Sequence, residues 1–134
     1  MKTDSKILAS FLAAAVWADG EYDEFEKEFV AEIAEELGVN TLQADLEAAI
    51  AATEAMSGEE LTESLEVAAK KVNNGEKEGV LSLCLQLMCA DAFLSIDEVE
   101  NFFTFAEVLG VEEDAAQALL DELVDEEDDL IIEE

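Results

Sequence analysis

Four carboxylates in this chain recur as two pairs with the same spacing. Asp19 is followed seven residues later by Glu26, and Asp91 is followed seven residues later by Glu98. The second pair lies 72 residues after the first. Carboxylate oxygens are the ligands that hard cations such as Ca²⁺ and Mg²⁺ prefer in proteins. Asp19, Glu26, Asp91 and Glu98 are therefore the candidate metal ligands of this chain, with Ca²⁺ or Mg²⁺ as the expected ion.

The first acidic pair does not belong to an EF-hand, although Glu21 and Asp23 add carboxylates at alternate positions of its turn. An EF-hand loop needs glycine at its sixth position and a bidentate glutamate at its twelfth. Glu24 and Val30 occupy these positions here. The second pair fails at the same two positions, so any cation site would be of another kind.

A purely structural role for the same acids is an alternative to cation binding. Asp23 with Glu26, and Ser95 with Glu98, have the spacing of a capping box, in which the two side chains satisfy free amides at a helix start. The aspartates could likewise bond free amides of the turn. The residues alone leave both interpretations open.

The elements that must position these acids are helices. Asp19 follows an apolar run, and Glu26 enters an amphipathic segment that ends at Gly38, a residue suited to a left-handed C-cap. Asp91, Glu98 and Gly110 repeat this arrangement. Periodicity and capping signals predict seven helices, at about 5–18, 24–37, 42–55, 59–72, 76–90, 96–109 and 114–123.

The first and fifth of these helices lack a polar face, which is typical of central, buried helices. We expect them to cross in the core. The second and sixth helices are amphipathic, and each should turn an apolar face inward. The predicted inward residues are Phe25, Phe29, Ile33 and Leu37 in the second helix, and Val99, Phe102, Phe103, Ala106 and Leu109 in the sixth.

The repeated spacing predicts one domain, residues 1–134, with an internal pseudo-twofold duplication. The repeat units are about 5–55 and 76–124, and a linking helix covers about 59–72. Residues 125–134 form an acidic tail. Its apolar residues 130–132 should fray unless they dock into a groove.

Composition favours an all-α protein, a single-domain bundle. The chain has no proline and 51% hydrophobic residues, dominated by good helix formers. β-branched residues are too scattered to build a sheet. The length is enough for one buried core.

The net charge of −30 comes from 36 acids against six basic residues, all of them lysine. Nucleic acid is excluded as a direct ligand, because phosphate binding needs clustered basic residues. An anionic membrane surface would repel the chain, and no apolar run is long enough to insert into a membrane. Cations and basic proteins are the expected partners, although adaptation to a saline environment would also explain the charge. The oligomeric state is left open.

Catalysis has little support in the residues. The chain has no histidine to act as a base near neutral pH. Cys84 and Cys89 point away from each other at helical spacing and have no partner at zinc-ligand spacing. Both cysteines are typical of buried thiols in a reducing compartment, so we expect a cytoplasmic protein. Because neither a histidine base nor an activated thiol is present in the sequence, we also expect that the protein is not an enzyme.

The doubled motif resembles the TerB-like family, which includes the tellurite resistance protein TerB and the N-terminal-like domain of DjlA. The first copy runs from Ala18-Asp19-Gly20 through Glu26 to Leu37-Gly38-Val39, and the second from Ala90-Asp91-Ala92 through Glu98 to Leu109-Gly110-Val111. The resemblance covers nearly the whole chain, since that family's domain is a duplicated helical bundle of similar size. Ala92 departs from the pattern, because the first copy has glycine there.

The resemblance implies a non-enzymatic module of stress responses and protein assemblies. It also implies an acidic cluster able to bind metal, which by position would be Asp19, Glu26, Asp91 and Glu98. The family's basic residues are mostly missing here, which argues against an anionic partner. The alternative hypothesis, from the charge alone, is an acidic nucleic-acid mimic that occupies a basic protein.

Overall fold

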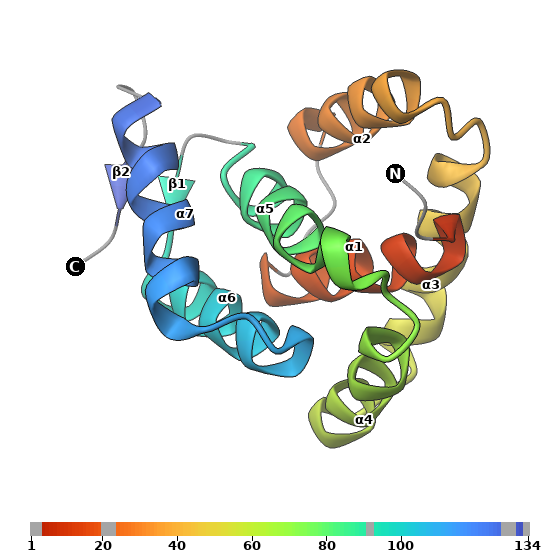
Figure 1. The fold of residues 1–134 in the computed structure, drawn as a ribbon. Coiled ribbons are helices and arrows are strands. Elements are labelled where there is room, and N and C mark those ends of the chain that lie inside the picture. The colour runs from red at the N-terminus through yellow and green to blue at the C-terminus, as the bar shows by residue number, and fades with distance from the viewer. Residues whose placement is uncertain (1–3, 20–23, 91–92, 127–130, 133–134) are drawn as a thin grey trace.

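The protein is an all-α bundle. The structure, a computed structural model, describes residues 4–19, 24–90, 93–126 and 131–132. Within these ranges it contains seven α-helices, one short 3₁₀ turn and a parallel pair of two-residue strands. Two helices cross in the middle, and the others surround them (Figure 1).

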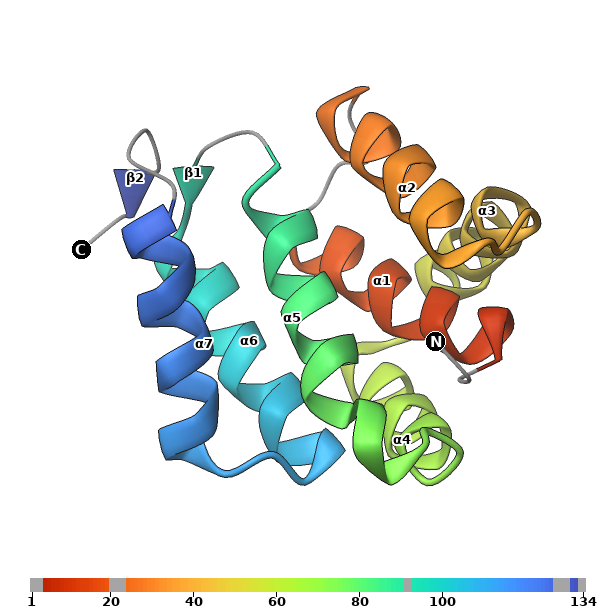
Figure 2. The same ribbon diagram turned by 45° about the horizontal axis from the view of Figure 1, so that its top comes forward.

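The central helices are α1 (Ser5–Asp19) and α5 (Lys77–Met88), as the sequence predicted. In α1, Leu8, Ala9 and every residue from Phe11 to Val16 are at most 5% exposed. The small alanine side chains among them let neighbouring backbones come close, and α1 contacts α3, α4, α5 and α6. Figure 2 shows α1 and α5 between α2 and α3 on one side and α6 and α7 on the other.

Helices α2 (Glu24–Leu37) and α6 (Ile96–Leu109) begin and end at equivalent residues of the two predicted repeats. Both end in a left-handed glycine, with φ of +68° at Gly38 and +79° at Gly110. The amide of Val39 then donates to the carbonyl of Ala34 over 2.9 Å, and the amide of Val111 to that of Ala106 over 2.8 Å. These bonds satisfy carbonyls that the helix end would leave open.

The remaining helices are α3 (Leu42–Glu54), α4 (Gly58–Ala69) and α7 (Glu113–Glu126). Each buries a stripe at helical spacing, such as Leu42 and Leu46 in α3. Helix α3 packs on α1, α4 on α1 and α6, and α7 on α5 and α6. After α4 the chain forms the 3₁₀ turn Asn74–Glu76, where the Asn73 side chain accepts a hydrogen bond from the amide of Gly75.

The C-terminal segment pairs with the chain between Asp91 and Glu98. Strand β1 (Phe93–Leu94) runs parallel to β2 (Ile131–Ile132), with Phe93 opposite Ile131 and Leu94 opposite Ile132. The tail was expected to fray unless residues 130–132 docked into a groove; instead residues 131–132 pair with β1 through the backbone. Leu130 lies outside the described residues, and α7 extends to Glu126, beyond the predicted end at 123.

Two inward faces were predicted incorrectly in part. Phe25 is 60% exposed, so it does not belong to the buried face of α2. In α6, Phe105 is buried although it was not predicted to be, whereas Val99 and Phe103 are only partly buried. The reason is that both buried stripes include a glutamate.

Candidate functional site

Glu26 and Glu98 occupy the same place in two matching helices. Each is the third residue of its helix, and their exposed fractions are 2% and 3%. The buried stripe continues in both helices at the same spacing, through Val30 and Ile33 in α2 and through Phe102, Phe105 and Leu109 in α6. Glutamate is almost never fully buried unless it is paired. The two helices therefore share an unusual feature, a carboxylate at the start of the inward stripe.

Glu98 is held in a capping box at the start of α6. The amide of Ser95 donates to its Oε1 over 3.1 Å, and the amide of Glu98 donates to Oγ of Ser95 over 3.1 Å. The partial positive charge of a helix N-terminus makes this a common position for an acidic side chain. The structural role predicted for Glu98 is thus confirmed.

Glu26 has the same burial at the start of α2. Its Oε2 is inaccessible to solvent, as is Oε2 of Glu98. Asp23, the predicted capping partner of Glu26, lies outside the described residues. The capping box of α2 therefore stays a prediction.

The two aspartates of the candidate site are less fully described. Asp19 is the last residue of α1, which places its backbone at the entry to the first turn. The side chain of Asp19 and the whole of Asp91 lie outside the described residues, as does Glu21. The approach of each aspartate to its glutamate therefore stays a prediction. Among the side chains that the structure describes, no three histidine, cysteine, aspartate or glutamate residues form a group able to hold a metal.

The thiol of Cys84 is unsuited to nucleophilic chemistry. Cys84 and Cys89 are both free, in agreement with the prediction that they form no mutual disulfide. Cys84 is fully buried, and burial raises the pKa of its thiol to about 12. A thiol with this pKa is protonated at neutral pH and is inert.

The carboxylate of Asp45 links α1 to α3 through side-chain hydrogen bonds, and sequence reasoning did not find this contact. The hydroxyl of Ser5 donates to Oδ2 of Asp45 over 2.6 Å, and that of Thr41 donates to the same oxygen over 3.0 Å. Hydrogen bonding from Ser5, helped by Thr41 and the charge of Lys6, holds the pKa of the Asp45 carboxyl below its usual range. The four-residue spacing of Thr41 and Asp45 was a local signal, but nothing in the sequence pointed to Ser5.

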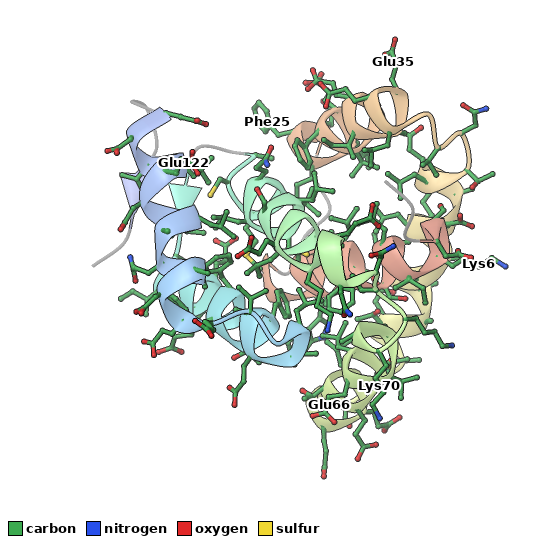
Figure 3. The ribbon with its side chains drawn as sticks, in the orientation of Figure 1. Lys6, Phe25, Glu35, Glu66, Lys70 and Glu122 are labelled. Carbon is green, nitrogen blue, oxygen red and sulfur yellow. The ribbon has the colours of Figure 1, made fainter. Side chains whose placement is uncertain are left out.

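Exposed acids cover most helices of the bundle rather than one face. Helix α7 has six exposed acids, and α2 has five, all of them glutamates. Figure 3 shows Glu35 of α2, Glu66 of α4 and Glu122 of α7 on different sides of the molecule. The charge is therefore spread around the surface and does not form a single acidic site.

The fold and these groups define a strongly acidic all-α bundle with two buried, equivalently placed glutamates. No family model matches the chain, and neither a curated protein nor a solved structure is significantly similar to it. Within the described residues, no helix combines the length and apolarity needed to cross a membrane.

Proposed function

We propose that this chain is a non-enzymatic interaction module of the TerB type, acting in the cytoplasm, whose two acidic turns bind divalent cations. The ligands would be Asp19 with Glu26 in the first turn, and Asp91 with Glu98 in the second. The observation that carries this proposal is the shared buried stripe of α2 and α6, which starts with a glutamate in each helix.

The duplicated arrangement supports a common origin for the two turns. Helices α2 and α6 agree in length and in their left-handed glycine ends, and each buried position of α2 has a buried counterpart in α6. Helix–helix contacts also correspond when the halves are exchanged, since α1 packs on α6 and α5 packs on α2. Two copies of one turn would be expected to bind the same kind of ligand.

The chemistry of the glutamates is compatible with a cation. An ionised carboxylate has about four acceptor positions on its two oxygens. The capping bond to Oε1 of Glu98 uses one of them, so capping and cation binding do not exclude each other. A divalent ion would also offset the cost of holding a carboxylate out of water.

The inert, buried thiol of Cys84 and the lack of histidine in the chain support a role without catalysis. The nucleic-acid-mimic alternative has less support. A mimic needs charges spaced like phosphates along one face, whereas exposed glutamates lie on every helix from α2 to α7.

Calorimetric titration with CaCl₂ and with MgCl₂ at about 0.15 M KCl tests the cation site, since this salt concentration screens weak surface binding. We expect saturable binding to the wild type and its loss in the double variant Asp19→Asn with Asp91→Asn. A matched control is Glu63→Gln with Glu66→Gln, which removes the same charge from exposed positions of α4. Equal binding by both double variants would contradict the proposal.

A further inference from the structure

The outer face of α2 combines an exposed aromatic ring with a row of acids. Phe25 is 60% exposed, more than Trp17, Val67, Ile96 or Val124, the other exposed large apolar residues of the described chain. Figure 3 shows its ring projecting away from the ribbon of α2. An apolar ring of this size in water costs free energy, which a binding partner could recover.

The comparison with α6 marks this phenylalanine as unusual. The position equivalent to Phe25 is Asp97, which is exposed and polar, as expected at an outward position. Each buried position of α2 has a buried counterpart in α6, whereas the outward positions of Phe25 and Asp97 differ. Phe29, one turn further along α2, is partly buried against the core, so apolar surface continues from the core to Phe25.

Acids surround the ring on the same helix. Glu28 lies one turn from Phe25, and Glu32 lies two turns from it on the same side. The full set of exposed acids on α2 is Glu24, Glu28, Glu32, Glu35 and Glu36, against a single lysine, Lys27. Helix α2 lies at one edge of the bundle, where it packs on α3 and α5, so its outer face is open (Figures 1 and 2).

We infer that this face, defined by Phe25, Glu28, Glu32 and Glu36, docks a basic amphipathic helix of a partner protein. The partner's apolar side would cover Phe25, and lysine or arginine at helical spacing would face the row of glutamates. An anionic membrane or a nucleic acid is repelled by the same acids. A second copy of this chain would bring acid against acid, so charge complementarity selects a cationic partner.

This inference deepens the proposed function and rests on its interaction-module part, not on the cation sites. Two fluorescein-labelled peptides of about 18 residues serve as probes, a length that spans α2. One carries lysine and leucine on opposite sides of a helix. The other carries the same lysines with glutamine in place of leucine. Anisotropy titration compares their affinities for the full chain at about 0.15 M salt, which screens diffuse attraction.

We expect the wild type to bind the lysine–leucine peptide more tightly than the lysine–glutamine peptide. Phe25→Ala should weaken binding of the first peptide about tenfold and leave the second unchanged, because aromatic anchors dominate such contacts. Val67→Ala is the matched control, since Val67 of α4 is 55% exposed. The double variant Glu28→Gln with Glu32→Gln should weaken the binding of both peptides. This loss should exceed that in the control double variant, Glu63→Gln with Glu66→Gln.

The inference is overturned if Phe25→Ala and Val67→Ala behave alike, or if the wild type does not distinguish the peptides. Concentration-dependent dimerisation that Phe25→Ala abolishes would also overturn it, because a second copy would then be the occupant. If the wild type binds both peptides equally tightly, the face of α2 is not the docking surface, although the protein still binds basic partners. If the wild type shows no saturable cation binding, the proposed cation sites at the acidic turns are wrong, but the docking surface on α2 is not affected by that result.

Discussion

Ser95 and Glu98 exchange two hydrogen bonds of 3.1 Å at the start of α6, each side chain accepting the other residue's amide. Replacing Ser95 by alanine removes one of these bonds and leaves an amide of the first turn unsatisfied. We expect Ser95→Ala to lower the free energy of unfolding by about 1 kcal/mol, measured by urea denaturation.

The control for this prediction is Ser10→Ala. The Ser10 hydroxyl donates to the carbonyl of Lys6 within α1, where alanine is the better helix former. Ser10→Ala should leave stability nearly unchanged. If the two variants have the same stability, the capping box does not stabilise α6.

The sequence predicted much of the fold because its strongest signals are local. Gly38 and Gly110 mark both helix ends correctly, and Ser95 with Glu98 marks the start of α6. The apolar runs of α1 and α5 predict their central position. Each of these features depends on residues that are close together in the sequence, so it can be recognised without knowledge of the tertiary structure.

The errors in the two inward faces have one physical cause. The predicted inward faces of α2 and α6 contained only apolar residues, because charged side chains normally lie on the surface. In the structure both stripes include a glutamate, Glu26 or Glu98, and this rotates each buried face toward it. Phe25 therefore turns outward, and Phe105 turns inward. Tertiary contacts such as that of Ser5 with Asp45 have no local signal at all.

The left-handed glycines give a second prediction. Gly38 and Gly110 have positive φ, which costs a residue with a Cβ about 1–2 kcal/mol. We expect Gly38→Ala and Gly110→Ala each to lower the free energy of unfolding by roughly that amount. In Gly58→Ala, at the first residue of α4, the added Cβ meets nothing within 4 Å and φ is ordinary. That variant should be neutral or more stable, and a similar loss in all three would refute the argument from backbone conformation.

Asp45 predicts a pH dependence. Its pKa in the folded protein is lowered, chiefly by the Ser5 hydroxyl, so its contribution to stability is present above its ordinary pKa of 3.8. The contribution is lost as the pH falls through the folded value. We expect Asp45→Asn to be less stable than the wild type at pH 7, and the difference to shrink below about pH 4, near the ordinary pKa.

Carboxyl chemical shifts check the cause directly. In Ser5→Ala the pKa of Asp45 should rise toward its usual range, because the main hydrogen bond is gone. An unchanged Asp45 titration in this variant would mean that Ser5 does not stabilise the carboxylate.

The charge of −30 predicts a strong effect of salt. Repulsion among exposed acids opposes folding, and it is screened as the Debye length falls from about 10 Å at 0.1 M to about 3 Å at 1 M. We expect Tm to rise steadily with KCl over this range. Specific cation sites would add a saturable rise with MgCl₂ or CaCl₂ at matched ionic strength. A Tm independent of KCl would show that surface repulsion is not significant.

The most direct test of the acidic turns is to titrate the isotopically labelled protein with Mn²⁺ and to follow each amide signal by NMR. Paramagnetic broadening at substoichiometric Mn²⁺ locates the bound ion. We expect two separate regions of broadening, around residues 19–26 and 91–98, and excess Mg²⁺ or Ca²⁺ should reverse both. Broadening spread evenly over the exposed glutamates of α2, α4 and α7, with no preference for the two turns, would contradict this prediction.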